Sequence, residues 1–302
     1  MNDQSVIRTE GLTKYYGNFP ALVDLNLDIR PGEIFGFLGP NGAGKTTTIR
    51  TLLDEIRPTK GTASILGMNT HKKSVEIRKH IGYLPGDLSM YPNLTGKDTL
   101  TYFANLRGGV DQSYVDSLAE RLNADLEKKV GDLSSGNRQK VGLIQAFMSR
   151  PQVLILDEPS VGLDPLVQRE FQAMMREATD EGRTVFLSSH TLSEVQRVAD
   201  RVGIIRHGKL AAVDSVSELR SKAIRRIELD FSTPVDAAVF ERISGVRDVT
   251  VEDNRAFLSF DGKMEDMLRC VMDRYDLLDI RIQEADLEEI FLTYYREEEV
   301  KA

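Results

Sequence analysis

The chain has 302 residues, so at roughly 150 residues per domain its length predicts about two domains. Hydrophobic residues make up 41% and charged residues 28%, a globular composition that excludes a mainly disordered chain. The formal net charge of -8 gives no basic excess for wrapping nucleic acid, which argues against a dedicated nucleic-acid-binding protein.

Two patterns describe the expected setting of the protein. The longest stretches without a charged side chain, 34–44 and 61–71, have 11 residues, whereas a membrane-spanning helix needs about 20 mostly apolar ones. We therefore expect no transmembrane helix. The opening MNDQSVIRTE has no apolar signal region, and a single cysteine, Cys270, suits a reducing compartment. These features predict a cytoplasmic protein.

The predicted elements of the first part of the chain are those of an α/β fold. Residues 24–29 alternate apolar and polar side chains, which predicts a half-buried strand of antiparallel type. Continuous apolar runs predict strands buried on both faces of a parallel sheet, at 33–38, 152–157 and 184–189. Helical patterns lie at 45–55, 113–122, 138–148 and 166–179. Two short strands around His207-Gly208 predict a hairpin.

After about Leu219 the pattern changes to that of a smaller α+β domain. Strands are predicted at 225–231, 246–253, 255–260 and 278–285, and helices at 235–243 and 264–274. This order, β-α-β-β-α-β, is that of a ferredoxin-like domain. From Asp286 onward, apolar residues at helical spacing predict a last, acidic helix. The predicted domains are therefore 1–219 and 225–302.

A phosphate-binding loop is the most informative feature. The pattern G-x-x-x-x-G-K-[ST] lies between a predicted strand and a predicted helix, at Gly39, Pro40, Asn41, Gly42, Ala43, Gly44, Lys45 and Thr46. Its glycines let successive N–H groups point at phosphate oxygens, and the helix start adds its positive dipole end. Lys45 supplies a charge to the β- and γ-phosphates, and the Thr46 hydroxyl is a ligand for Mg²⁺. Together with neighbouring Thr47, the loop predicts binding of ATP with Mg²⁺.

A pair of carboxylates predicts hydrolysis as well as binding. Asp157 ends the apolar strand 152–157, where its carboxylate can meet the same Mg²⁺. Glu158 follows directly. A carboxylate beside the γ-phosphate can polarise the attacking water, so we predict that Glu158 is the general base.

Together with these motifs, the segment Leu133-Ser134-Ser135-Gly136-Asn137 resembles the signature of the nucleotide-binding subunits of ATP-binding cassette (ABC) transporters. The resemblance runs from about Ser5 to Ser217. It implies a P-loop NTPase fold of ABC ATPase type, with an antiparallel β subdomain and a helical subdomain. It also implies a homodimer in which Ser134, Ser135 and Gly136 bind the γ-phosphate held by the other copy.

The resemblance implies roles for three further residues. Tyr16 matches the aromatic residue that stacks on adenine, although Tyr15 beside it competes for the role. Asp164 matches a carboxylate that tightens the dimer contact. His190 matches a histidine that holds the γ-phosphate and the attacking water, a role that imidazole can fill as a donor.

The sequence departs from the family pattern in two places. Gly86 stands where the family has a Gln that touches Mg²⁺, and Asp87 is an alternative metal ligand one position later. Ser135 and Asn137 replace a Gly and a Gln of the signature. Because Ser134 and Gly136 are kept, we expect slower hydrolysis rather than none.

The C-terminal extension is similar to that of drug-resistance-type exporter subunits, which implies a separate six-helix permease and a peripheral place on the inner face of the membrane. The segment 88–94 is either a permease docking site or local core. We therefore expect an ATPase subunit that powers an ABC exporter by head-to-tail dimerisation. The alternatives are an ATP-gated module that hydrolyses slowly or not at all, and a soluble ABC protein acting on nucleic acid or ribosomes.

Overall fold

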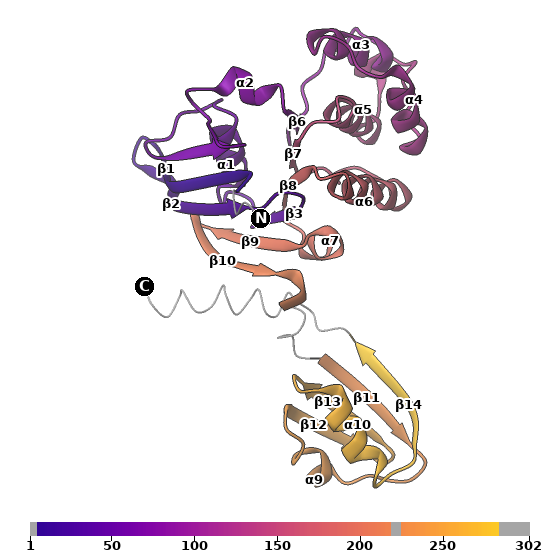
Figure 1. Cartoon of the computed structure of the whole chain (residues 1–302). Helices are drawn as coiled ribbons and strands as arrows, with labels where there is room; N and C mark the ends of the chain where they lie inside the picture. The colour runs from indigo at the N-terminus through magenta and orange to yellow at the C-terminus, as the bar shows by residue number, and fades with distance from the viewer. Residues whose placement is uncertain (1–4, 219–224, 284–302) are drawn as a thin grey trace. The chain divides into compact units, whose positions relative to one another are not determined.

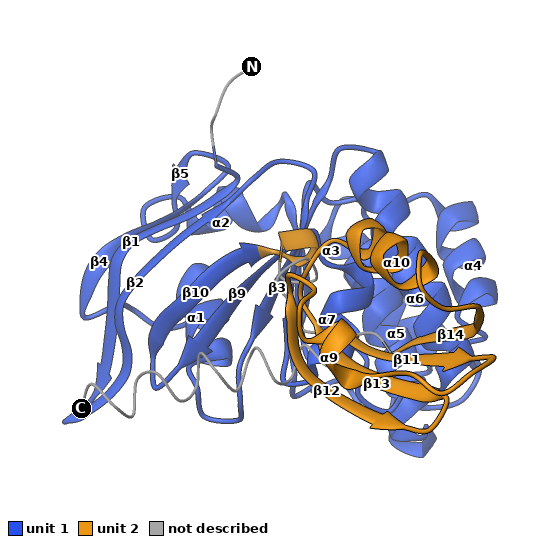
Figure 2. Cartoon of the chain, turned by 90° about the horizontal axis from the view of Figure 1, so that it is seen from below, with its two compact units in different colours: residues 1–214 blue, residues 215–302 orange. Residues whose placement is uncertain are grey.

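The computed structural model describes residues 5–218 and 225–283, and the chain divides into two compact units (Figure 2). Unit 1 comprises Met1–Asp214 and unit 2 comprises Ser215–Ala302. The predicted boundary between 219 and 225 lies outside the described residues, and so does the acidic helix predicted from Asp286 onward. The predicted domain limits and the acidic helix therefore stay predictions.

A six-stranded sheet forms the centre of unit 1, with the order β10-β9-β3-β8-β7-β6 (Figure 1). Five of its strands pair in parallel: β3 (Ile34–Leu38), β6 (Ile81–Leu84), β7 (Val153–Asp157), β8 (Thr184–Ser189) and β9 (Arg201–Arg206). Every residue of β3, β7 and β8 is buried, as their continuous apolar runs predict. The last strand, β10 (Lys209–Ser215), follows β9 at the predicted turn.

Helices follow the carboxyl ends of the parallel strands. These are α1 (Lys45–Leu52) after β3, α6 (Pro165–Asp180) after β7 and α7 (Leu192–Val198) after β8, while α5 (Ser135–Phe147) precedes β7. The ring of Phe186 on β8 lies 6.1 Å from Phe35 and 5.4 Å from Phe37, between ring centroids, which fixes β3 against β8. Because parallel strands end at the same edge, the loops after β3, β7 and β8 meet there.

A second, antiparallel sheet has the order β2-β1-β4-β5. Its strands are β1 (Ile7–Tyr16), β2 (Phe19–Ile29), β4 (Lys60–Ile65) and β5 (Met68–Asn69). Of these four strands, the sequence predicted only the second half of β2. The strand β1 was missed because its pairing with β2 has register shifts between Thr9 and Tyr15, and the adjacent residues Leu12 and Thr13 are both buried. Such bulges break the alternation on which strand prediction depends.

The remaining helices of unit 1 are α2 (Ser74–Arg78), α3 (Gly96–Leu106) and α4 (Gln112–Arg121), with a 3₁₀ turn η1 (Val130–Asp132). Arg121 joins α4 to α6, because its Nε lies 2.5 Å from Glu170 Oε1 and its two terminal nitrogens lie 2.7 Å from the oxygens of Glu177. No helix within residues 5–218 or 225–283 combines the length and apolar character that crossing a bilayer requires.

Within residues 225–283, unit 2 has six elements, and they follow the predicted order. They are β11 (Arg225–Phe231), α9 (Ala237–Phe240), β12 (Val246–Glu252), β13 (Arg255–Phe260), α10 (Met264–Met272) and β14 (Leu277–Gln283). The strands form an antiparallel sheet in the order β12-β13-β11-β14, with a core of its own that includes Phe231, Phe240 and Phe260. The predicted helix 235–243 is shorter than expected. The ferredoxin-like assignment stays a prediction.

Gly82 on β6 offers a test of the packing between β6 and α5. A Cβ at this position would lie 2.0 Å from the carbonyl oxygen of Ala146 and 2.8 Å from the ring of Pro151. Neither atom is the end of a flexible side chain, so the strand or the helix must move. We expect Gly82→Ala to lower the free energy of unfolding by about 1–3 kcal/mol. Urea denaturation measures the change, and an unaltered midpoint would contradict the observed packing.

Candidate functional site

One cavity of about 300 Å³ collects the predicted phosphate loop, the predicted base and an aromatic residue. Its walls come from the loop after β3 with the start of α1, from the end of β7, and from the turn between β1 and β2. The lining residues are Tyr16, Phe19, Ala21, Pro40, Asn41, Gly42, Gly44, Lys45, Thr46, Thr47 and Glu158.

The phosphate loop has the backbone conformation that its glycines predict. Gly42 has φ 80° and Gly44 has φ 114°, values that a residue with a side chain rarely adopts. A Cβ on Gly44 would also lie 2.9 Å from the carbonyl oxygen of Ala21. Gly44 is the N-cap of α1, and no side chain caps this helix end. The first N–H groups of α1 are therefore available to an anion.

Lys45 lies deep in this loop, with only 6% of its side chain exposed. Its ammonium group donates to the carbonyl oxygens of Gly39 at 2.6 Å and Pro40 at 3.2 Å. It also lies 3.2 Å from Glu158 Oε1. The structure thus pairs the cation predicted for the phosphates with the predicted base. Nucleotide phosphates must compete with the Glu158 carboxylate for Lys45.

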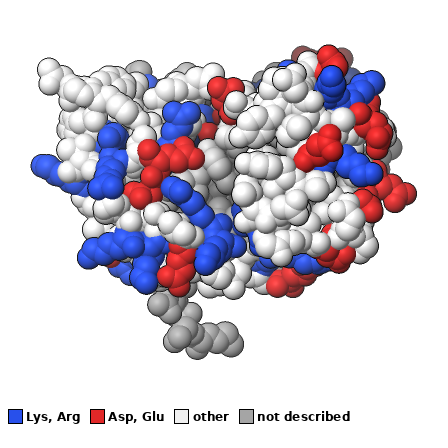
Figure 3. All heavy atoms as spheres, turned by 90° about the horizontal axis from the view of Figure 1, so that it is seen from above, with Lys and Arg blue, Asp and Glu red and all other residues white. Residues whose placement is uncertain are grey.

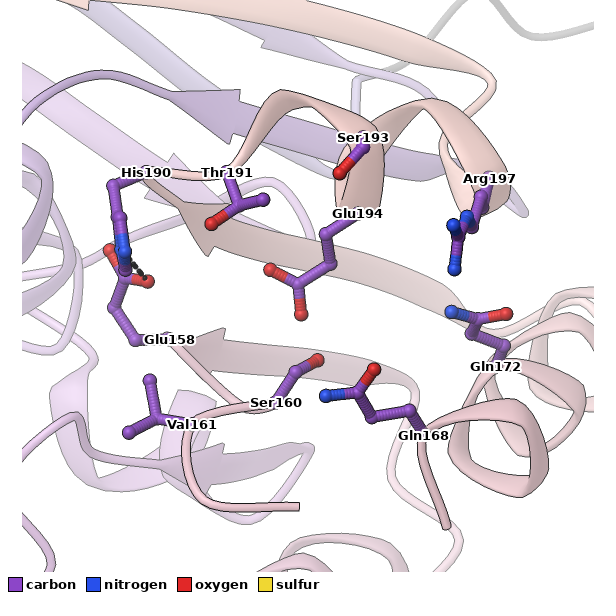
Figure 4. A pocket seen from close by; sticks show the side chains of 10 residues that line it. All are labelled: Glu158, Ser160, Val161, Gln168, Gln172, His190, Thr191, Ser193, Glu194 and Arg197. Atoms are coloured by element: carbon purple, nitrogen blue, oxygen red, sulfur yellow. Dashed lines mark hydrogen bonds and ion pairs between the residues drawn. The ribbon is translucent and has the colours of Figure 1, made fainter. Parts of the chain in front are cut away.

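Glu158 stands at a constrained position after β7. Its φ of 51° is in the left-handed region, and its N–H group donates to the carbonyl and hydroxyl oxygens of Ser188, both at 3.2 Å. On the side away from Lys45, the Oε2 atom lies 2.7 Å from Nδ1 of His190, the contact drawn in Figure 4. The three predicted catalytic residues therefore meet at a single carboxylate.

The two oxygen groups predicted to hold Mg²⁺ are in contact. The Thr46 hydroxyl donates to Asp157 Oδ2 at 2.9 Å, and the Ser188 hydroxyl donates to Asp157 Oδ1 at 2.5 Å. A buried carboxylate beside a hydroxyl suits a hard divalent cation. Within residues 5–218 and 225–283, no cluster of three or more His, Cys, Asp or Glu side chains is placed to hold a metal ion. Thr46 and Asp157 therefore fit a site that Mg²⁺ shares with phosphate oxygens.

The loop after β6 approaches this pair through Gly86. A Cβ on Gly86 would lie 3.2 Å from Asp157 Oδ2, so the backbone itself is against the carboxylate. Asp87 is exposed, and in the described part of the chain no hydrogen bond or ion pair joins it to Thr46 or Asp157. Its role as a metal ligand stays a prediction.

The aromatic wall consists of Tyr16 and Phe19. Tyr16 is 48% exposed and Lys14 Nζ lies 5.2 Å from its ring centroid, while Tyr15 is not part of the lining. Tyr16 is therefore the better placed of the two candidate tyrosines. Phe19 pairs with Tyr16 across the turn and is 63% exposed. Phe19 was not predicted as a site residue. The turn residues Gly17-Asn18 could have indicated it, because a two-residue turn places residues 16 and 19 opposite each other.

The signature residues lie outside this cavity. The Ser134 hydroxyl accepts from the N–H group of Asn137 at 3.2 Å and caps α5. The Asn137 amide bonds the backbone of Asp125 in both directions, at 3.0 and 2.7 Å. It therefore anchors the loop before α5. The predicted phosphate-binding roles of Ser134, Ser135 and Gly136 stay predictions, and so does the dimer role of Asp164, which caps α6.

A second cavity, of about 270 Å³, lies on the other side of Glu158. Figure 4 shows the Glu194 carboxylate pointing into it, between His190 and the polar side chains of α6. The Ser189 hydroxyl donates to Glu194 Oε2 at 2.5 Å. Burial raises the pKa of Glu194, and the negative charge of Glu158 adds to the rise, while Ser189 and His190 offset part of it. This carboxyl therefore holds its proton above the ordinary range.

Replacing Glu194 tests that assignment through stability. Above the ordinary pKa of 4.5 the carboxyl ionises freely in the unfolded chain but not in the folded one, so its contribution to stability falls as the pH rises. Gln does not titrate and can still accept from Ser189. We expect the unfolding free energy of Glu194→Gln, relative to wild type, to increase between about pH 4.5 and about pH 8. Urea titrations at both pH values measure it, and a pH-independent difference would contradict the raised pKa.

The chain is similar to known proteins along nearly its whole length. A family model described as "ABC transporter" matches residues 22–161. The bacitracin transport ATP-binding protein BcrA of Bacillus licheniformis is 35% identical over 297 residues, 95% of this chain and 96% of that protein. BcrA of Enterococcus faecalis is 37% identical over 252 residues, 82% of each chain. A solved structure of an ATP binding subunit of an ABC transporter has a TM-score of 0.66 at 27% identity, and the match covers 72% of this chain and 92% of that chain.

Proposed function

Because the chain belongs to the ATP-binding proteins of the ABC transporter family, we propose that it hydrolyses ATP to power an exporter. The observation that carries the proposal is the meeting of Lys45, Glu158 and His190 beside the phosphate loop. An exporter is supported by the two relatives named as bacitracin transport ATP-binding proteins. The transported compound contacts the permease and is not specified by this chain.

The side chains of the cavity divide the chemistry of hydrolysis among them. Tyr16 and Phe19 stack on the adenine, and the N–H groups at the start of α1 bind the phosphates. Thr46 and Asp157 would hold Mg²⁺, which neutralises charge on the phosphates when bound. Glu158 accepts the proton of the water that attacks the γ-phosphorus, while the bond to the β–γ bridging oxygen breaks. His190 holds the second oxygen of Glu158 and keeps the carboxylate in position.

A second copy of the chain completes the site in this proposal. Ser134, Ser135 and Gly136 lie outside the cavity of their own chain, so they remain available to a nucleotide held by a partner. A hydroxyl and the N–H groups at the start of α5 suit a γ-phosphate. Two chains arranged head to tail would then enclose two nucleotides, with Asp164 at the contact between them.

The permease docks, in this proposal, on the face that Figure 3 shows from above. Uncharged surface lies there beside Lys and Arg side chains that are interspersed with Asp and Glu. The segment 88–94 and α3 expose apolar side chains, with Tyr91 at 56% and Leu106 at 67% exposure, and the Tyr91 ring lies 5.8 Å from that of Tyr102. Large exposed apolar groups of this kind are typical of interaction sites. Docking would hold the chain at the inner face of the membrane.

Phosphate release from the purified full-length chain tests the proposal. We expect MgATP to be hydrolysed, and we expect ATP to shift the chain from monomer to dimer in light scattering when turnover is blocked by chelating Mg²⁺. A dimer without phosphate release in the presence of Mg²⁺ would favour the ATP-gated binding module instead. If the chain neither forms a dimer nor releases phosphate, both functions are refuted. A permease that co-purifies with the chain would support the exporter.

A further inference from the structure

The start of α5 is packed against the segment that follows Glu158. A Cβ on Gly136 would lie 2.4 Å from the carbonyl oxygen of Gly162, so the two backbones are in direct contact. One turn later, the Gln139 side chain donates through Nε2 to the carbonyl oxygen of Pro159 at 2.9 Å. Residues 136 and 139 share one face of the helix, and that face meets residues 159–162.

Gln139 therefore acts on the backbone immediately after the predicted base. Glu158 has a left-handed φ of 51°, a conformation that persists only where the surroundings enforce it. Ser188 accepts a hydrogen bond from the N–H group of Glu158. Gln139 donates to the carbonyl group of Pro159, the residue that follows Glu158. Gln139 is 9% exposed, so water does not readily replace this hydrogen bond.

We propose that Gln139 is a positioning residue that ties Glu158 to the signature segment of the same chain. The inference rests on the proposed function, in which that segment binds the nucleotide of the partner. A partner nucleotide that orders Ser134–Gly136 would then also fix residues 158–159, through the rigid first turns of α5. A nucleotide in one site of the dimer thereby affects the position of the Glu158 that serves the other site.

Gln139→Met removes the donor at nearly constant volume. Because Gln139 does not line the nucleotide cavity, we expect KM for ATP to stay nearly unchanged. We expect kcat to fall about tenfold, the effect of one buried hydrogen bond lost where the base is positioned. The Hill coefficient for ATP should fall toward one. If Gln139 had only a packing role, its replacement would not lower kcat at an unchanged KM, and it would leave the Hill coefficient as it is.

Gln145→Met is the matched control. Gln145 lies on the same helix, is half-buried and makes no hydrogen bond to residues 159–162. We expect its kcat and Hill coefficient to equal those of the wild-type chain. If both variants lose the same activity, the effect belongs to α5 as a whole and the proposal is wrong.

Mixed dimers separate the two routes by which Gln139 could act. Two full-length copies with different affinity tags are combined, and the mixed dimer is purified through both tags. One copy carries Glu158→Gln, so only the other copy has an intact base. We expect Gln139→Met to slow phosphate release when it is in the copy with the intact Glu158, and to have little effect in the other copy. Loss only in the other copy, or in neither, would overturn the inference. A wild-type dimer without turnover would instead refute the proposed function, and the inference would fall with it.

Discussion

Glu158→Gln is expected to lower the turnover number for ATP about a thousandfold, within the range by which a positioned general base accelerates proton transfer. The amide keeps the shape of the side chain and its place beside His190, 2.7 Å away in the wild-type chain, but cannot accept the proton of the attacking water. Binding should persist, because the cavity keeps its phosphate loop. Affinity for ATP should even rise, since Lys45 is released from the carboxylate that it contacts at 3.2 Å.

Single-turnover phosphate release measures the first effect, and a fluorescent nucleotide titration measures the second. Glu120→Gln is a suitable control, because Glu120 is an exposed carboxylate on α4 outside both cavities. It changes the net charge by the same amount. Turnover in Glu158→Gln as fast as in the control and the wild-type chain would show that another group is the base.

Lys45→Met is expected to weaken ATP binding about a hundredfold, which corresponds to the loss of charge-assisted hydrogen bonds in a protected site. Lys45 is 6% exposed and already aligned by the carbonyl oxygens of Gly39 and Pro40, so its charge acts in a poorly solvated position. Methionine keeps the length of the chain and removes the charge. The Glu158 carboxylate then loses its cation and repels the phosphates further.

Isothermal titration with ATP and Mg²⁺ measures this change. Lys72→Met removes the same charge from an exposed position before α2 and should leave the affinity unaltered. A similar loss in both variants would mean that the overall charge of unit 1, and not the contact of Lys45, controls nucleotide binding.

The parallel strands and the phosphate loop were predictable because their signals are local. The strands β3, β7 and β8 are buried on both faces, and a continuous apolar run is a sufficient sign of that environment. The loop between β3 and α1 needs positive φ angles at Gly42 and Gly44, so its glycines mark it directly. In unit 2 the bounds of β11 and β13 agree with the prediction for the same reason, since both strands alternate regularly.

Features that depend on neighbours distant in the chain were not predictable. The helix α3 is an exception, because it was missed although its start carries a local signal, the capping box of Thr95 and Asp98. Asn137 was interpreted as a departure from a phosphate-binding motif, whereas its amide is committed to the backbone of Asp125. The link between Gln139 and Pro159 joins residues 20 positions apart, and no local pattern announces it.

The ion pairs of Arg121 connect two helices of unit 1. Its planar guanidinium group donates to Glu170 along one edge and to both oxygens of Glu177 along another. Glu170 and Glu177 are seven residues apart, about two turns of α6, so the single side chain of Arg121 connects α4 to two successive points along that helix. Rotation of α4 about its contact with α6 would have to break at least one of these ion pairs.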